Sequence, residues 1–160
     1  MNVYANLKKL GLVLPPPPAK GGLYTPAKGF GGNLIYISGC GPNIDASLPP
    51  ITGKLGRDFT VEQGAEYARN CMLNVLAVLE RYLNGLNDAK DLNSVKSAVK
   101  LLCLVASADD FYAQPQVANG ASGLLIDLYG EEAGTPTRSA IGVNVLPGNM
   151  PVEVEAIFEL

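Results

Sequence analysis

The apolar residues between positions 65 and 83 recur every three or four positions, which is the period of an α-helix. Thr60 and Gln63 have the spacing of a capping box at the start of this segment, and Gly85 follows its last turn. The sequence therefore predicts a long amphipathic helix over residues 60–85. Because such a helix must bury its apolar face against a second layer, the chain is restricted to layered folds.

The other elements predict one sheet on which two helices pack. Residues 95–105 alternate at first and then become apolar throughout, as in a strand covered on both faces, so we expect this strand at the centre of the sheet. A second helix is predicted over residues 115–129, with Gly130 as its terminator. The remaining strands are expected in two hairpins, which pair residues 23–30 with 34–38 and residues 138–145 with 152–160.

The resulting order, ββαβαββ, predicts an α+β sandwich in which a mostly antiparallel sheet carries both helices on one face. The second face of the sheet would then expose apolar side chains to water. In a chain of 160 residues the simplest cover for that face is another copy of the chain, so we expect a closed homo-oligomer.

Residues 1–21 are predicted to be an extension outside the main domain, which we place at residues 22–160. Residues 2–11 fit a short helix that Asn2 caps and Gly11 ends. The four consecutive prolines that follow cannot continue the helix, and a stiff polyproline spacer is favoured over a recognition ligand for a partner. We expect the extension through Pro18 to lie away from the functional site.

The chain contains no histidine, which excludes Ser-His-Asp and Cys-His catalysis, the His pair of ribonuclease-type chemistry and His-containing zinc sites. Cys40, Cys71 and Cys103 are far apart and form no CxxC pair, so we expect neither a disulfide framework nor a thiolate zinc site. Of these thiols, Cys40 is the one candidate for reactivity. The acidic residues are scattered, and the Gly-rich stretches lack the lysine of a phosphate loop, so no metal or cofactor is expected.

The formal net charge of −3 argues against a broad phosphate-binding surface, so nucleic acid is not expected as a partner. No apolar run approaches the roughly 18 residues of a membrane span. The N-terminus also lacks the pattern of a signal peptide. We therefore expect a cytoplasmic protein that does not associate with membranes.

The C-terminal stretch TRSAIGVNVLPGNMPVEVEAIFEL resembles the closing signature of the Rid (YjgF-type) family of reactive-intermediate deaminases, also called the endoribonuclease L-PSP family. In that family an Arg-Ser pair opens a strand, a Leu-Pro pair ends it, and a Glu-x-Glu-Ala-Ile strand closes the domain. The matching positions are Arg138, Ser139, Leu146, Pro147, Glu153, Glu155, Ala156 and Ile157. Upstream, GGLYTPAKGFGGNLIYISG is similar to the first two strands of the family, and FYAQPQVANGASGLLIDLYGE is similar to its second helix.

The resemblance covers about residues 22–160 and implies a chorismate-mutase-like fold, assembled as a homotrimer with clefts between subunits. It also implies hydrolysis of an enamine or 2-imino acid to a 2-keto acid and ammonia, without a cofactor. Two features depart from the family pattern: the N-terminal extension, and Cys40 in place of the usual glutamine after Ser-Gly. We interpret the chain as a member of a longer subgroup, in which pocket changes can redirect substrate choice.

Two residues are the candidates for catalysis on a small carboxylate. Arg138 presents paired N–H donors that match a carboxylate, and Glu153 would position a water or move a proton. Glu155 shares the strand face of Glu153 and has a weaker claim. The resemblance assigns substrate binding to four further positions, Tyr24, Asn119, Ser38 and Gly39.

Each candidate also has an ordinary structural explanation: a surface arginine, a solvated strand face, a packed tyrosine, a solvent-facing amide or a turn glycine. If the last two strands form a regular hairpin, Arg138 and Glu153 lie about 20 Å apart. We therefore expect these two residues to meet only across a subunit boundary.

Three functions remain open at this point. Hydrolytic deamination of imines leads, because imines hydrolyse readily once a carboxylate and a water are held in place. A small-carboxylate-binding protein that senses a metabolite without turnover is the alternative. RNA cleavage, which the older family name suggests, is the least favoured because the chain is acidic and lacks histidine.

Overall fold

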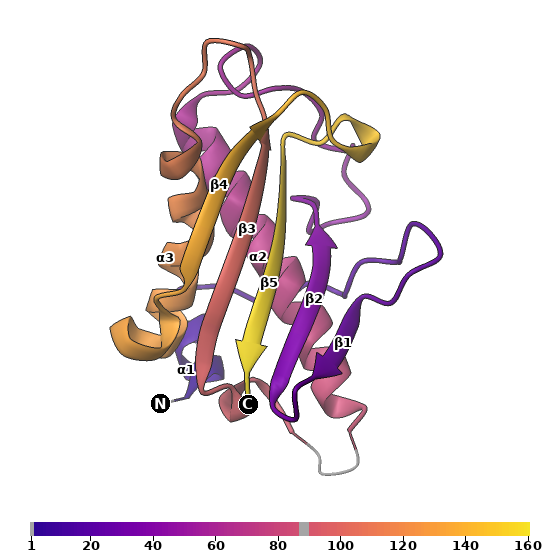
Figure 1. The fold of residues 1–160 in the computed structure, drawn as a ribbon, viewed down its shortest axis with the longest axis vertical. Helices are drawn as coiled ribbons and strands as arrows, with labels where there is room; N and C mark the ends of the chain where they lie inside the picture. The colour runs from indigo at the N-terminus through magenta and orange to yellow at the C-terminus, as the bar shows by residue number, and fades with distance from the viewer. Residues whose placement is uncertain (1, 87–89) are drawn as a thin grey trace.

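The computed structural model describes residues 2–86 and 90–160, and within them a five-stranded sheet has the order β1-β2-β5-β3-β4. The two long helices cover one face of this sheet, as Figure 1 shows. The elements in chain order are α1 (Val3–Lys9), β1 (Ala27–Phe30), β2 (Leu34–Cys40), α2 (Val61–Asn84), η1 (Leu92–Ser94), β3 (Ser97–Ala106), α3 (Gln114–Gly134), β4 (Thr137–Val143), η2 (Pro147–Asn149) and β5 (Val152–Glu159). The predicted α+β sandwich is confirmed.

Helix α2 forms as its sequence pattern predicts. The Thr60 hydroxyl accepts a hydrogen bond from the Gln63 backbone N–H, and the Gln63 side chain accepts one from the Thr60 N–H. These reciprocal bonds satisfy two N–H groups that the helix itself leaves unpaired. The apolar side of α2 is buried against the sheet and against α3.

Helix α3 lies so close to α2 that one contact is between backbones. A Cβ atom added at Gly120 would lie 1.8 Å from the carbonyl oxygen of Ala65. Pro115 sits in the first turn of α3, as expected. Gly130 interrupts the helix with a φ of 78°. We expected the helix to end at this glycine, but it resumes after Gly130 and continues to Gly134.

Strand β5 is the centre of the sheet, because it pairs antiparallel with both β2 and β3. Its side chains alternate strictly between the two faces. The helix face receives Val152, Val154, Ala156 and Phe158, all buried. The opposite face receives Glu153, Glu155, Ile157 and Glu159, all half-buried.

The predicted C-terminal hairpin is wrong. Strand β4 pairs with β3 in parallel, and β3 lies between β4 and β5. The reason is that α3 carries the chain back along the sheet after β3, so that the next strand runs in the same direction as β3. Strand β3, which we expected at the centre of the sheet, is therefore an interior strand next to the central strand β5.

The first strand begins later than the sequence predicts. Residues 23–26 lie outside β1, and Leu23 and Tyr24 are exposed. Pro26 has no backbone N–H to donate to a neighbouring strand, although its carbonyl accepts a hydrogen bond from Ser38. Tyr24 therefore belongs to the connection that leads into the sheet and not to a strand.

The face of the sheet opposite the helices stays open in a single chain. Leu102 and Leu104 of β3 are half-buried there, and Ile141 of β4 is 46% exposed. The expectation that β3 is covered on both faces is therefore wrong for one chain alone. None of the helices in the described ranges combines the length and apolar character needed to cross a bilayer.

The N-terminal helix α1 is fixed to the rest of the fold. The Asn2 side chain caps it by accepting from the Ala5 N–H, and Gly11 follows it with a φ of 67°. The Asn6 side chain donates to the Leu128 carbonyl of α3. From α1 the chain crosses behind α2 to reach β1 at the other edge of the sheet (Figure 1).

We predict that Gly120→Ala lowers the free energy of unfolding by about 1–3 kcal/mol, because the new methyl group forces α3 away from α2. Gly123→Ala, on the same helix, is the matched control, since a Cβ there meets no atom within 4 Å. The control should raise stability by up to about 1 kcal/mol. Urea unfolding of both variants measures the difference, and equal stability would contradict the close helix contact.

Candidate active site

A cleft of about 550 Å³ opens where the connection before β1, the end of β2 and the start of β5 meet α2. It brings together four of the six predicted site residues: Tyr24, Ser38, Gly39 and Glu153. The other residues that line it are Pro18, Ala19, Gly21, Pro26, Cys40, Gly41, Val78, Pro147 and Met150. Polar groups and apolar walls therefore share one cleft.

Glu153 is the acidic residue of this cleft. Its carboxyl group lies over Gly39, where an added Cβ would be 1.8 Å from the carboxylate oxygen Oε1. Burial raises the pKa of Glu153, and the neighbouring Glu155 carboxylate adds to this effect. A carboxyl group with a raised pKa is suited to exchanging protons with a ligand.

Tyr24 and Ser38 hold the connection before β1 against β2. The Ser38 hydroxyl donates to the Thr25 carbonyl at 2.8 Å. The Tyr24 oxygen accepts from the Gly21 N–H at 3.3 Å, which leaves the phenolic O–H available as a donor. Tyr24 and Ser38 thus both line the cleft, which Tyr24 reaches from outside the strand, and their roles in binding stay a prediction.

Arg138 and Asn119 lie together at a second place, on the side of β4 that faces α3. The Arg138 Nη1 group donates to the Asn119 Oδ1 at 2.9 Å and to the Ser122 hydroxyl at 3.1 Å. The Nη2 group donates to the Pro115 carbonyl at 3.2 Å. Within the described residues, the Nε–H and one Nη2–H remain without a partner, so α3 fixes the guanidinium while part of it stays free.

The side chains of Arg138 and Glu153 do not meet within one chain. Arg138 is aligned with Leu101 and Ala156, whereas Glu153 is aligned with Leu104. Strand β3 lies between the strands of Arg138 and Glu153, so two inter-strand spacings and three residues along the strand separate them, which is about 14 Å between their Cα atoms. Their side chains also point to opposite faces. The separation of about 20 Å that we expected is wrong, because β4 and β5 do not form a hairpin.

The three cysteines are buried and unpaired. Burial raises the pKa of Cys40 to about 12, with the Glu153 carboxylate adding to the effect, and burial raises the pKa of Cys103 to about 12. Burial also raises the pKa of Cys71. Since a buried, protonated thiol is a poor nucleophile, Cys40 has no environment that would activate it. In residues 2–86 and 90–160, no three His, Cys, Asp or Glu side chains are grouped to hold a metal ion.

Comparison with known proteins matches residues 17–160 to the family model of Endoribonuclease L-PSP. The chain belongs to this family. It is 39% identical over 158 residues to Protein TCP17 of Trypanosoma cruzi, a match that covers 99% of this chain and 94% of that protein.

Two crystal structures show how widely the fold is shared. The protein Atu1372 of Agrobacterium tumefaciens has a TM-score of 0.84 and 37% identity, over 99% of this chain and 91% of that one. The YjgF gene product of E. coli has a TM-score of 0.60 and 26% identity, over 90% of this chain and 93% of that one. The resemblance to the YjgF-type family is therefore confirmed.

The end of the N-terminal extension takes part in the cleft of this L-PSP family member, which sequence reasoning missed. Pro18, Ala19 and Gly21 line the cleft beside Tyr24. The expectation that the extension through Pro18 is remote from the cleft is wrong for Pro18 itself. A signal was present in the spacing, because the six residues from Pro18 to Tyr24 span at most about 20 Å. Residues 1–16 lie outside the match to the family model.

We predict that Glu153→Gln stabilises the protein at pH 7, because the buried carboxylate is costly to ionise and its pKa is raised on folding. The gain should stay below about 1 kcal/mol, since Glu153 keeps contact with solvent. It should shrink as the pH falls through the raised pKa and vanish below the unfolded-state value, where the wild-type carboxyl is neutral in both states. Chemical unfolding at several pH values measures this, and a gain that grows toward acid would contradict the assignment.

Proposed function

We propose that this protein hydrolyses enamines or 2-imino acids to 2-keto acids and ammonia, in clefts that form between the subunits of a homotrimer. The observation that carries the proposal is the separation of two complementary half-sites. The cleft around Glu153 contains no Lys or Arg among its described lining residues, and the partly unpaired Arg138 guanidinium points to the other face. A second chain that brings its Arg138 to the cleft would complete a carboxylate-binding site.

In the proposed mechanism, Arg138 of one subunit holds the substrate carboxylate through its two remaining N–H donors. Glu153 of the next subunit accepts a proton from a water as the water oxygen bonds to the imine carbon. The C=N electron pair moves to nitrogen, which takes this proton from Glu153 to give a carbinolamine. Glu153 then accepts the proton of the carbinolamine hydroxyl group and passes it to the amino nitrogen, so that the C–N bond breaks, ammonia departs and the 2-keto acid forms.

The open sheet face supports the proposed assembly. Leu102, Leu104, Ile141 and Ile157 present apolar surface there that a single chain leaves in contact with water. Burying this face between copies would remove that surface and bring β4 of one chain near the cleft of another. The unpaired cysteines fit a reducing compartment, and we propose the cytoplasm.

RNA cleavage, which the family description suggests, has little support from this site. Glu153, Glu155 and Glu159 lie on the same face of β5, where they would repel phosphates. The chain has no histidine for the acid and base steps of ribonuclease-type chemistry.

We predict that Arg138→Ala reduces kcat/KM for imine hydrolysis thirty- to a thousandfold, because a lost charge-assisted pair costs on the order of 2–4 kcal/mol. Arg138→Lys should recover little, since an ammonium group cannot reproduce the paired donors. The assay generates 2-iminobutanoate in situ and subtracts its uncatalysed hydrolysis. Unchanged activity in Arg138→Ala would refute the role of this residue. Carboxylate binding by a wild-type protein that turns over no imino acid would instead indicate a sensor.

We predict further that inactive Arg138→Ala and Glu153→Gln chains regain activity when they are mixed. If each site takes one residue from each of two neighbouring subunits, random mixing restores about a quarter of the sites. Denaturing and refolding the two variants together, followed by light scattering and the imine assay, tests this. A trimer with no regained activity would place both residues in the same chain's site, and a monomer would remove the shared-cleft arrangement.

A further inference from the structure

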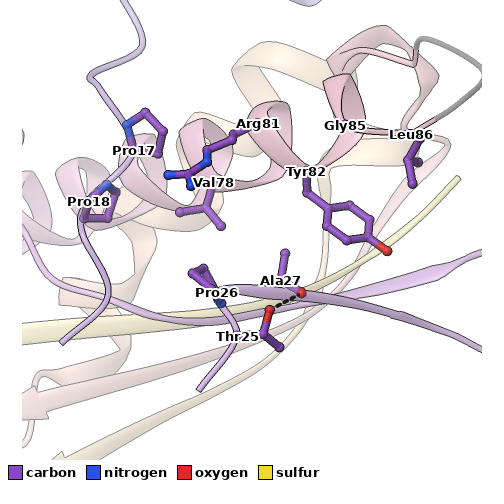
Figure 2. Close-up of a pocket in the computed structure, with 10 residues that line it drawn as sticks. All are labelled: Pro17, Pro18, Thr25, Pro26, Ala27, Val78, Arg81, Tyr82, Gly85 and Leu86. Atoms are coloured by element: carbon purple, nitrogen blue, oxygen red, sulfur yellow. Dashed lines mark hydrogen bonds between the residues drawn. The ribbon is translucent and has the colours of Figure 1, made fainter. Parts of the chain in front are cut away.

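We infer that the substrate of this site carries a large apolar side chain, which lies in a second cavity behind the cleft. This inference rests on the proposed function, and it adds the class of 2-imino acid that the site accepts. The second cavity has a volume of about 310 Å³ and lies between the N-terminal segment, α2 and the start of β1, as Figure 2 shows.

The two cavities adjoin each other. Pro18, Pro26 and Val78 line both of them, one residue from each of the three segments that meet there. A ligand whose carboxylate and imine lie near Glu153 therefore has its side chain directed along Val78, provided that the side chain is long enough. A methyl or ethyl side chain would leave the second cavity unused.

The walls of the second cavity select for apolar groups. Pro17, Pro18, Pro26 and Leu86 contribute no side-chain donors. The Thr25 hydroxyl already donates to the Ala27 carbonyl, and the Tyr82 oxygen accepts from the Gly29 N–H, so the Tyr82 O–H and the Arg81 guanidinium are the side-chain donors left in the described wall. A polar side chain would gain few hydrogen bonds here, whereas each buried CH₂ group is expected to improve affinity about fourfold.

Among the described residues that line this cavity, Arg81 is the charged one. In Figure 2 its guanidinium reaches over Val78 toward Pro17. A planar guanidinium stacks well on an aromatic ring, and the three proline rings offer flat apolar surfaces opposite. An aromatic side chain therefore fits this cavity as well as a branched aliphatic one.

The proline run gives this wall its rigidity. Proline has a fixed φ and no N–H group, so Pro17 and Pro18 line an apolar cavity without leaving a backbone donor unsatisfied. The segment is held at one end by α1, whose Asn6 bonds to α3, and at the other by the Gly21 bond to Tyr24. A rigid wall fixed at both ends can discriminate ligands by size.

The test measures the binding of three 2-keto acid products by calorimetry: pyruvate, 4-methyl-2-oxopentanoate and phenylpyruvate. Wild-type protein should bind the two larger acids at least tenfold more tightly than pyruvate. Val78→Phe should fill the junction of the cavities and remove this preference, so that the two larger acids bind no more tightly than pyruvate. Val78→Ala, which widens the junction and is less demanding on folding, should keep the preference.

Val13→Phe is the matched control, because Val13 is 84% exposed and lines neither cavity. It should behave as wild type toward all three acids. Equal binding of the three acids by wild type, or a size preference that survives in folded Val78→Phe protein, would overturn the inference. Size-selective binding without hydrolysis of the matching imines would instead defeat the proposed function and leave the side-chain cavity in place.

Discussion

The two-sided pairing of β5 determines the organisation of this protein. Because β5 is bonded to β2 and β3 at once, its alternating side chains must be sorted strictly between a helix-covered core and an open face. Valine, alanine and phenylalanine face the core, and three glutamates and one isoleucine face outward. A shift of one residue in register would bury the glutamates, so the pairing that forms the core also places Glu153 beside the end of β2. The candidate site is thus a consequence of the register of the sheet.

Local signals in the sequence identify the elements of this fold well. The capping box at Thr60, the cap at Asn2 and the alternation of residues 152–160 all describe interactions within a few residues, and each is found in the structure. Local signals do not predict which strands pair. The loop LPGNMP indicates that the chain turns, but it does not determine which strand the following strand pairs with. The strand–helix–strand order of β3, α3 and β4 was the better guide, since a helical crossover favours parallel neighbours.

The sequence names the candidate residues more readily than it predicts how they are arranged. The resemblance to the L-PSP family identified Tyr24, Ser38, Gly39 and Glu153, and these residues share one cleft. It carried no information on the walls that Pro18 and Val78 provide, because one comes from the N-terminal segment and the other from the middle of a long helix. The contact of Val78 joins residues that are distant in sequence, so no periodicity or spacing encodes it, whereas the short distance in sequence from Pro18 to Tyr24 did give a signal.

The position of Arg138 gives a physical reason for a shared site. Arg138 lies on β4, one of the two edge strands of the described sheet, and its side chain is turned toward α3. Glu153 lies on the central strand and faces away from the helices. No rotamer change carries a side chain from one face of a sheet to the other, so a single chain cannot bring these groups to one ligand. An edge strand is also the part of a sheet most accessible to a neighbouring copy. In the proposed assembly, cooperation between subunits lets a fixed guanidinium and a carboxyl group with a raised pKa act on the same small molecule.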